Sequence, residues 1–173
     1  YARDAETGAE IWTMEADDPS VNAAFINWFE GNSAIGPDGN LYVPNDNFFI
    51  YAIDRADGTV RWTFRVFDQA WSLPAVDPVT GNIYTGNNNL LAFLGPNTFV
   101  IDPAGNEIWS TATDGSVVAS PLFDPVGKVY VGGFDGYLRA YDAADGTELW
   151  TFPTREHIYA SPAMLSDGRL IQP

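Results

Sequence analysis

Acidic side chains in short, glycine-containing segments are the residues of this sequence whose types and spacing could do chemistry. Asp54/Asp57 and Asp142/Asp145 form two such pairs, and carboxylate oxygens are ligands that Ca²⁺ prefers. A calcium ion takes roughly six to eight oxygens, however, whereas each segment offers one or two carboxylates. An aspartate at the start of a turn also accepts hydrogen bonds from its own downstream N–H groups. We therefore interpret these aspartates as turn caps.

Other catalytic residue types are scarce. The sequence contains one histidine, His157, and no cysteine, which excludes a histidine cluster for a metal, a choice of bases for a Ser-His-Asp set, and a cysteine nucleophile within it. His157 stands beside Arg155 and Glu156 in a predicted loop. We interpret it as a solvated surface residue, with a binding role as the alternative. The residue types thus favour a protein that is not an enzyme.

Composition narrows the fold that must position these residues. The 12 prolines and 16 glycines are too dense for a helical bundle, and 46% hydrophobic residues are too many for a disordered chain. An all-β protein remains. The net charge of −15, from 8 Lys plus Arg against 23 Asp plus Glu, excludes a basic nucleic-acid surface. The longest apolar run, residues 90–94, is too short to span a membrane.

Internal repeats define the architecture. The phrase Ala-x-Asp-x-x-x-Gly-x-x-x-Trp ends at Trp12, Trp62 and Trp150, and a form one residue shorter ends at Trp109, so the four tryptophans are 50, 47 and 41 residues apart. A second phrase, Gly-x-hydrophobic-Tyr, alternates with the first, and a serine stands before each copy of this second phrase. In sequence order these serines are Ser33, Ser72, Ser120 and Ser161.

Each repeat is predicted to form four short strands, because alternating apolar and polar runs flank every glycine-containing turn. We expect complete units at 33–71, 72–119 and 120–160, the back half of a unit at 1–32, and the front half of another at 161–173. A four-stranded unit of about 40–50 residues has the size of a β-propeller blade. The tryptophan that ends each unit is predicted to fill the seam against the neighbouring blade.

These three phrases, in constant order over the whole chain, resemble the tryptophan-docking repeats of the pyrroloquinoline quinone (PQQ)-like β-propeller superfamily. The superfamily includes quinoprotein alcohol dehydrogenases, BamB-type lipoproteins that scaffold outer-membrane protein assembly, and surface domains without enzymatic activity. Its propellers commonly have seven or eight blades, so the resemblance implies that about four blade-equivalents are part of a larger propeller. Closure into a four-bladed ring, with 161–173 completing the blade begun by 1–32, is the alternative.

An open propeller of this kind would expose apolar seams, which monomers rarely tolerate. We therefore expect a protein partner, the remainder of the same propeller, or self-association through the seams. Under the dehydrogenase alternative the resemblance implies PQQ and calcium, with Asn87 in Gly86-Asn87 as a weak candidate calcium ligand. The disulfide of adjacent cysteines often found in those enzymes cannot form in this chain. Otherwise we expect no cofactor and no metal.

The best binding candidates come from topology. Loops that lead from the outer strand of one blade to the inner strand of the next lie on one face of a propeller, beside its channel. Their aromatic and polar side chains fit a protein, peptide or sugar surface, and the alternative is that the aromatics plug the channel as core. The candidates are Trp28, Glu30, Asp68, Gln69, Trp71, Arg155, Glu156, His157 and Tyr159.

The sequence therefore favours a non-catalytic PQQ-like propeller that acts as a protein-binding or scaffold module of an exported protein, extracellular or periplasmic. A fragment of a PQQ- and calcium-dependent quinoprotein dehydrogenase is the alternative. A carbohydrate-binding propeller is a second alternative. Neither nucleic acid nor a membrane span is expected.

Overall fold

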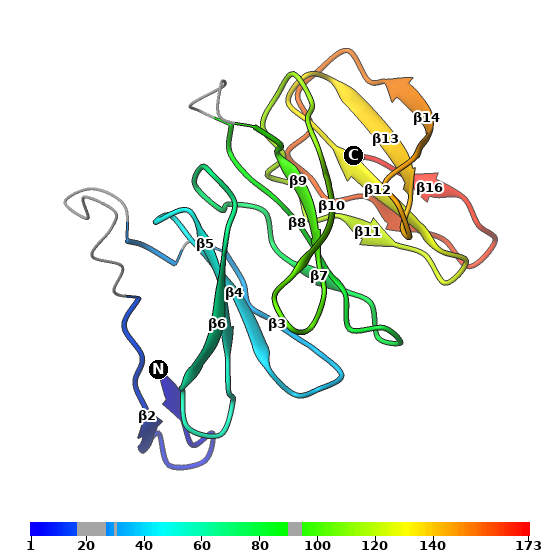
Figure 1. Cartoon of the computed structure of the whole chain (residues 1–173). Coiled ribbons are helices and arrows are strands. Elements are labelled where there is room, and N and C mark those ends of the chain that lie inside the picture. Colours follow the sequence, from blue (N-terminus) through cyan, green and yellow to red (C-terminus); the bar gives the residue numbers. More distant parts are fainter. Residues whose placement is uncertain (17–26, 30, 90–94) are drawn as a thin grey trace.

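The computed structural model describes residues 1–16, 27–29, 31–89 and 95–173, and all regular elements in these ranges are β-strands (Figure 1). They form three antiparallel four-stranded sheets and two antiparallel two-stranded sheets. The predicted all-β fold built of four-stranded units is confirmed. In this part of the chain no helix exists that is long and apolar enough to cross a membrane.

Each four-stranded sheet is a meander in which consecutive strands are neighbours. The first blade contains β3 (Ala34–Ile35), β4 (Leu41–Asn45), β5 (Phe49–Ile53) and β6 (Val60–Arg65). The second contains β7 (Ala75–Val76), β8 (Ile83–Gly86), β9 (Thr98–Ile101) and β10 (Glu107–Thr111). The third contains β11 (Leu122–Phe123), β12 (Lys128–Gly132), β13 (Tyr137–Asp142) and β14 (Glu148–Pro153).

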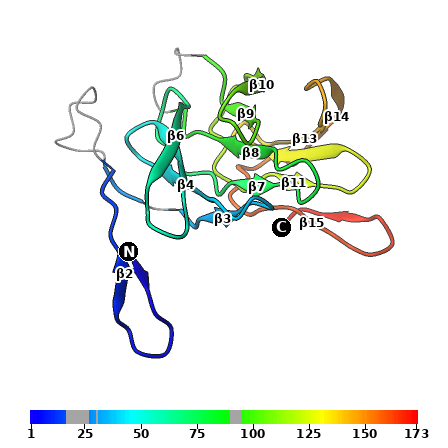
Figure 2. The ribbon, with the colours of Figure 1, turned by 60° about the horizontal axis from the view of Figure 1, so that its bottom comes forward.

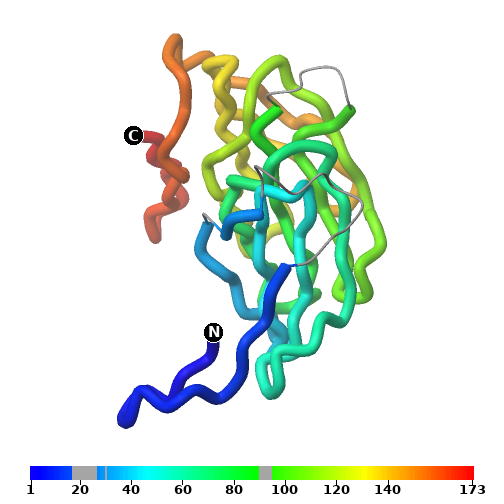
Figure 3. Tube along the Cα trace, turned by 90° about the vertical axis from the view of Figure 1, so that its left-hand side faces the viewer, coloured from blue at the N-terminus to red at the C-terminus, as the bar shows by residue number. Residues whose placement is uncertain are grey.

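The two-stranded sheets lie at the ends of the chain. An N-terminal half blade contains β1 (Ala2–Arg3) and β2 (Glu10–Trp12), and a C-terminal half blade contains β15 (Ala163–Met164) and β16 (Leu170–Ile171). Figure 2 shows the inner strands β3, β7, β11 and β15 in a row along one edge of the molecule. Figure 3 shows the N-terminal half blade, in blue, projecting below the first blade and separate from the C-terminal half blade, in red.

The aspartates of the paired segments cap the turns that join the two outer strands of each blade. In the third blade the Asp142 side chain accepts the N–H of Ala144 at 2.9 Å, and its carbonyl accepts the N–H of Gly146 at 2.9 Å. Asp145 accepts the N–H of Thr147 at 2.9 Å. These bonds confirm the prediction of turn caps, and they explain why the repeat requires aspartate at these positions.

The core lies between blades rather than within one. One buried cluster joins Tyr42 and Ile50 of the first blade to Ile83 and Phe99 of the second. Another joins the second and third blades, and a third lies between the third blade and the C-terminal half blade. Since both faces of a blade are apolar, each blade depends on its neighbours for burial.

Tryptophans fasten these seams. The ring of Trp109, on β10, lies against Gly146 of the third blade, and its indole N–H donates to the carbonyl oxygen of Ala143 at 3.0 Å. A methyl group on Gly146 would meet the ring at 2.7 Å. The same arrangement occurs at two other seams. The ring of Trp12 lies against Gly58, and its indole N–H donates to the carbonyl oxygen of Arg55. The ring of Trp62 lies against Gly105, and its indole N–H donates to the carbonyl oxygen of Pro103.

Trp150 differs from the three docked tryptophans. It stands on β14 at the open edge of the third blade, where its side chain is 39% exposed, against 7% for Trp109. It contacts Tyr130 of its own blade, with ring centroids 5.8 Å apart. The blade beyond Trp150 is represented here by its two inner strands alone, without the turn on which a tryptophan docks, so the docking of Trp150 stays a prediction.

Candidate functional site

The loop face contains the predicted binding residues. We define it as the side that carries the connections from one blade to the next together with the β4–β5, β8–β9 and β12–β13 hairpins; it lies at the upper side of Figure 1. The opposite side, the turn face, carries the β3–β4, β7–β8 and β11–β12 turns and the aspartate-capped turns between outer strands.

A series of backbone hydrogen bonds links the loop face from blade to blade. Each bond joins an inter-blade connection to a hairpin of a neighbouring blade, so the connections are held in place by main-chain groups. The bonds run from Asp46 N–H to the Trp28 carbonyl at 3.0 Å, Asn88 to Gln69 at 2.9 Å, Val117 to Asn87 at 2.9 Å, and Phe134 to Ser116 at 2.9 Å.

Backbone strain is concentrated on this face. The described non-glycine residues with positive φ all stand in hairpins or connections of the loop face: Phe48 at 77°, Phe67 at 65°, Asn89 at 46° and Arg155 at 73°. A left-handed conformation of a residue with a bulky side chain is unfavourable by about 1–2 kcal/mol. Such strain gathers at ligand-binding and switch regions, which makes this face the first place to look for function.

Exposed aromatic side chains occupy the loop face. Trp28 is 63% exposed, Trp71 is 36% exposed and Tyr159 is 68% exposed. None of the three belongs to a core cluster formed by the described residues, and whether they line or fill the channel of the larger propeller stays open. The indole N–H of Trp71 donates to Asp46 Oδ1 at 3.0 Å, which fixes the ring beside the β4–β5 hairpin. We refer to Trp28, Asp46 and Trp71 as the first aromatic patch.

A second aromatic patch consists of Phe134, His157 and Tyr159. The imidazole of His157 stacks on Phe134 with centroids 5.3 Å apart, and its Nδ1–H donates to the Phe134 carbonyl oxygen. The ring of Tyr159 lies 4.4 Å from that of Phe134, centroid to centroid. His157 is thus an exposed member of a stacked group rather than an isolated solvated residue. Arg155 and Glu156 are exposed beside it.

The polar candidates of the first blade are placed differently from the expectation. Asp68 is buried, with 4% of its surface exposed, and Gln69 is half-buried. The backbone carbonyl oxygen of Gln69 accepts a hydrogen bond from the backbone N–H of Asn88. The side-chain oxygen of Gln69 accepts a second one from the side-chain amide of Asn88 at 3.3 Å. These two residues therefore support the loop and do not present an acidic surface. Glu30 lies outside the described residues.

Two residues of the patches had not been singled out from the sequence. Asp46 and Phe134 stand in the hairpins between the second and third strands of their blades. Topology places those hairpins on the same face as the inter-blade connections, and this shared face is the signal in the sequence that points to both residues.

Asn87 has a structural role. Its amide nitrogen donates to the carbonyl oxygens of Val66 and Pro96, the latter at 3.2 Å, and its side-chain oxygen accepts the N–H of Asn89 at 3.2 Å. A calcium ligand must direct its oxygen at the ion among several other oxygens. In the described ranges no group of three or more acidic or histidine side chains is placed to hold a metal. These residues do not fit the calcium site of a quinoprotein.

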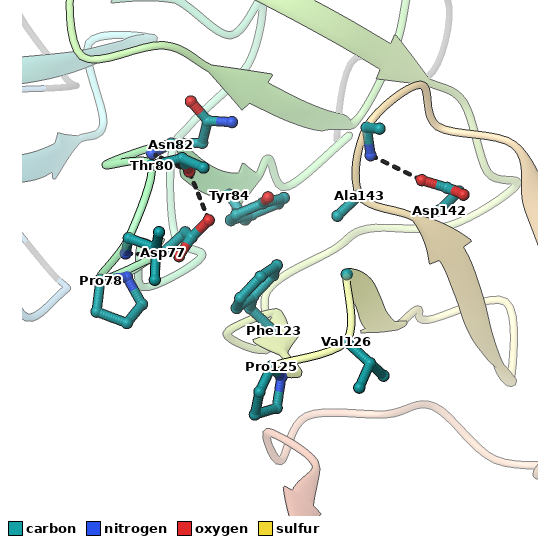
Figure 4. A pocket seen from close by; sticks show the side chains of 13 residues that line it. Asp77, Pro78, Thr80, Asn82, Tyr84, Phe123, Pro125, Val126, Asp142 and Ala143 are labelled. Carbon is teal, nitrogen blue, oxygen red and sulfur yellow. Dashed lines mark hydrogen bonds between the residues drawn. The ribbon is translucent and has the colours of Figure 1, made fainter.

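A pocket opens on the turn face, between the second and third blades. Its volume is about 660 Å³, and the rings of Tyr84 and Phe123 stack along its wall with centroids 5.5 Å apart (Figure 4). Two carboxylates line it. Asp77 accepts the N–H of Val79 at 2.8 Å and the hydroxyl of Thr80.

Few side chains in the pocket could act as a general acid or base. Asp142, the second carboxylate, caps its own turn. Burial raises the pKa of the Tyr84 phenol to about 12, and the negative charge of Asp77 raises it as well, so Tyr84 stays neutral near neutral pH. The described lining residues include no histidine, lysine or arginine. Without an acid and base in facing positions, the pocket can hold an apolar group but shows no arrangement for catalysis.

The docked blades and the loop face together define a tryptophan-docked β-propeller with exposed aromatic side chains on its loop face. More particularly, the family model described as "Outer membrane protein assembly factor BamB" matches residues 1–94 and again residues 68–171. The chain therefore belongs to this family, within the PQQ-like β-propeller superfamily that the repeats predicted.

Individual relatives agree with this assignment. The BamB outer membrane protein assembly factor of Burkholderia pseudomallei is 27% identical over 115 residues, which are 66% of this chain and 28% of that protein. The serine/threonine-protein kinase AfsK of Streptomyces coelicolor is 31% identical over 126 residues, 70% of this chain and 14% of that protein. The chain thus spans less than a third of these relatives.

A solved structure shows the same fold. The crystal structure of BamB from Moraxella catarrhalis matches with a TM-score of 0.69 at 20% sequence identity. The match covers 92% of this chain and 51% of that chain. The arc formed by these blades therefore has the shape of about half of that propeller.

Proposed function

We propose that this chain is part of a non-catalytic binding or scaffold propeller that holds a partner protein on its loop face. The observation that carries the proposal is the pair of exposed aromatic patches on a face whose loops are fixed by main-chain hydrogen bonds. Partly exposed tryptophan and tyrosine rings supply most of the binding energy in many protein interfaces. Rings held in place before binding lose little conformational entropy on association.

The Trp71–Asp46 pair gives the first patch a defined chemistry. The indole offers an apolar surface, and its N–H is already satisfied by the carboxylate. A partner side chain can therefore pack on the ring without leaving a polar group unpaired. In the second patch, Phe134 provides an apolar centre between the His157 and Tyr159 rings. Both patches suit the apolar side chains of a peptide segment laid across the face.

The name of the BamB relatives supports a scaffold role. BamB is an outer membrane protein assembly factor by name, and we extend to this chain the role of holding another protein, with an exported location, periplasmic or extracellular. A protein partner is the expected ligand, and no cofactor is required.

Site-specific photocrosslinking in cells tests the proposal. A photoreactive amino acid in place of Trp71 or Tyr159 should crosslink a specific protein, identified by mass spectrometry, whereas the same residue at Val126, exposed on the turn face, should not. The purified partner should then bind wild type and lose at least about tenfold in affinity for Trp71→Ala and Tyr159→Ala. Equal crosslinking from both faces would contradict the proposal.

Two further measurements separate the alternatives. Saturable binding of PQQ with Ca²⁺, accompanied by dye-linked alcohol oxidation, would assign the chain to the quinoprotein dehydrogenases and overturn the scaffold role. Binding to a glycan array that is lost in Trp28→Ala and Trp71→Ala would favour the carbohydrate-binding alternative. The proposed function requires both assays to be negative while the protein partner still binds.

A further inference from the structure

One position of the repeat differs from blade to blade on the turn face. It follows the aspartate that begins each turn between outer strands, and in the first, second and third blades it is occupied by Arg55, Pro103 and Ala143. The three residues are equivalent in space, because the backbone carbonyl oxygen of each accepts the indole N–H of a docked tryptophan. We call this the covering position.

In the first two blades the side chain at the covering position lies over a glycine of the turn between the two inner strands. A methyl group on Gly39 would meet Nε of Arg55 at 3.2 Å, and one on Gly81 would meet the ring of Pro103 at 2.9 Å. The equivalent glycine of the third blade is Gly127, and nothing lies within 4 Å of the position of its methyl group. The alanine at the covering position of this blade is too short to reach across it.

The turn-face pocket occupies this uncovered place. Gly127 and Ala143 both line it, together with the rings of Tyr84 and Phe123 (Figure 4). Its volume of about 660 Å³ lies in the range of small-molecule sites, about 300–1,000 Å³. All lining residues lie between positions 77 and 144, in the second and third blades, and both of these blades have four strands. The pocket is therefore formed without either end of the chain.

Asp77 places a negative charge in the wall of this pocket. The residue is only 4% exposed, and its carboxylate accepts the N–H of Val79 and the hydroxyl of Thr80. Figure 4 shows the carboxylate next to the ring of Tyr84. None of the ion pairs between described residues includes Asp77. Because a buried charge is unfavourable without an opposite charge, a cation in the pocket would be stabilised here.

The aromatic wall suits the apolar part of such a cation. The rings of Tyr84 and Phe123 are stacked with an angle of 24° between their planes. Apolar groups pack well on such rings, and a positive charge is attracted to an aromatic face. The other blades agree with this chemistry, since Arg55 places a guanidinium at the covering position and Pro103 places an apolar ring there.

We infer that the turn-face pocket binds a small organic cation with an apolar ring or chain. The apolar part lies on Tyr84 and Phe123, and the cationic group pairs with Asp77. The net charge of −15 favours the approach of a cation. An anion would find no opposite charge, because the described lining contains no histidine, lysine or arginine. This site is separate from the proposed function, since the aromatic patches lie on the opposite face.

Three probes of similar size and different charge test the ligand class: phenethylammonium, 2-phenylethanol and 3-phenylpropionate. Titrations of the purified protein followed by nuclear magnetic resonance should give a dissociation constant of about 1 mM or below for phenethylammonium, as expected for a ligand of this size. The alcohol should bind at least about tenfold more weakly, and the carboxylate more weakly still. Nuclear Overhauser effects from the phenyl protons to Tyr84 and Phe123 should locate the bound probe.

A substitution at the covering position is the second test. Ala143→Arg introduces the residue type of the first blade, so its side chain should occupy the pocket and lower the affinity for phenethylammonium by at least about tenfold. The fold should tolerate it, because position 143 bonds to Gly127 and Trp109 through main-chain groups alone. Ala104→Arg is the matched control. It adds the same charge at an exposed position of the second blade that does not line the pocket, and the affinity should be unchanged.

Asp77→Asn tests the role of the buried charge. It should lower the affinity for phenethylammonium by at least about tenfold and leave that for 2-phenylethanol unchanged. Asp38→Asn, in the equivalent turn of the first blade, is the control and should bind both probes as the wild type does. Circular dichroism checks that each variant is folded. If Asp77→Asn does not fold, the three probes and Ala143→Arg still decide.

Three results would overturn the inference. Equal affinities for phenethylammonium and 2-phenylethanol would show that charge plays no part. Nuclear Overhauser effects to Trp71 or Tyr159 in place of Tyr84 would place the bound probe on the loop face. Wild-type affinity in folded Ala143→Arg would place it outside the pocket. None of these results bears on binding of a protein partner by the loop face, so the two proposals fail separately.

Discussion

The indole ring of Trp109 lies on the backbone of Gly146, in the next blade, at a distance that leaves no room for a side chain. The same ring donates its N–H to the carbonyl oxygen of Ala143 at 3.0 Å. Trp109 is thus joined to a turn of the next blade, 37 positions further along the chain at Gly146, by an apolar contact and a directed hydrogen bond. The same relationship joins Trp12 to Gly58 and Trp62 to Gly105, and the stability predictions rest on it.

Trp109→Ala should lower the free energy of unfolding by about 3–5 kcal/mol, because it leaves a cavity at a buried seam and an unpaired Ala143 carbonyl. Trp150→Ala, at the exposed edge, should cost about 1 kcal/mol. Urea unfolding followed by circular dichroism gives both values. Equal losses would show that burial of the ring in the seam is not what stabilises the fold.

Gly146→Ala should destabilise the protein more than Gly127→Ala, by about 1–3 kcal/mol. Both glycines have positive φ, 75° and 88°, so both substitutions introduce similar backbone strain. Only the methyl group at position 146 meets a tryptophan ring, at 2.7 Å. Thermal unfolding of the two variants separates the contact from the strain. If they melt together, the glycine is required for its backbone conformation alone.

Asn87→Ala should destabilise the fold by about 1–3 kcal/mol, because it leaves the buried carbonyl oxygens of Val66 and Pro96 without their donor. Adding millimolar Ca²⁺ should leave the melting temperature of the wild type unchanged. Differential scanning fluorimetry with and without Ca²⁺ measures both effects. A calcium-dependent rise in the melting temperature that disappears in Asn87→Ala would restore the calcium-ligand interpretation.

Stability should fall at acid pH because of the turn aspartates. A hydrogen bond from the backbone N–H of Ala56 holds the pKa of Asp54 below its usual 3.8, with a further contribution from Arg61, and one from the N–H of Thr147 does the same for Asp145. A pKa lowered by folding means that the stabilisation is present above pH 3.8 and is lost as the pH falls through the folded value.

Urea midpoints between pH 6 and pH 2.5 measure this acid dependence. Asp54→Asn/Asp145→Asn should flatten the acid limb of the curve, because neither side chain can then take up a proton. Asp114→Asn, at an exposed loop position, is the control and should leave the acid limb intact. An acid limb that is unchanged in the double variant would mean that other carboxylates control it.

The repeat phrases predicted the fold well because each mark reflects a local physical need. Aspartate and glycine recur because a tight turn needs a cap and a left-handed residue, as Asp142 and Gly146 show. The tryptophan recurs because each seam needs a large flat ring with one donor, as Trp109 shows. These contacts form within one repeat or between neighbouring repeats, so the residues that make them recur at a regular spacing in the sequence.

The loop face was only partly predictable. Trp71 and Tyr159 were identified because they depart from the repeat consensus, and both are exposed. The sequence could not show that Asp68 is buried, since its burial depends on how the loop folds back. Nor could it show that Phe134, from the β12–β13 hairpin, contacts both His157 and Tyr159. Contacts between loops follow no period.

By itself, the sequence determined the strand order, the turn caps and the position of each docking tryptophan, since these depend on neighbours within about one repeat along the chain. Only the tertiary structure decided how deeply each of these tryptophans is buried in this arc of blades. Trp109 and Trp150 end the same phrase, yet one is buried and the other is exposed. The difference arises because burial is a property of the neighbouring blade, and the blade beyond Trp150 has two strands in place of four.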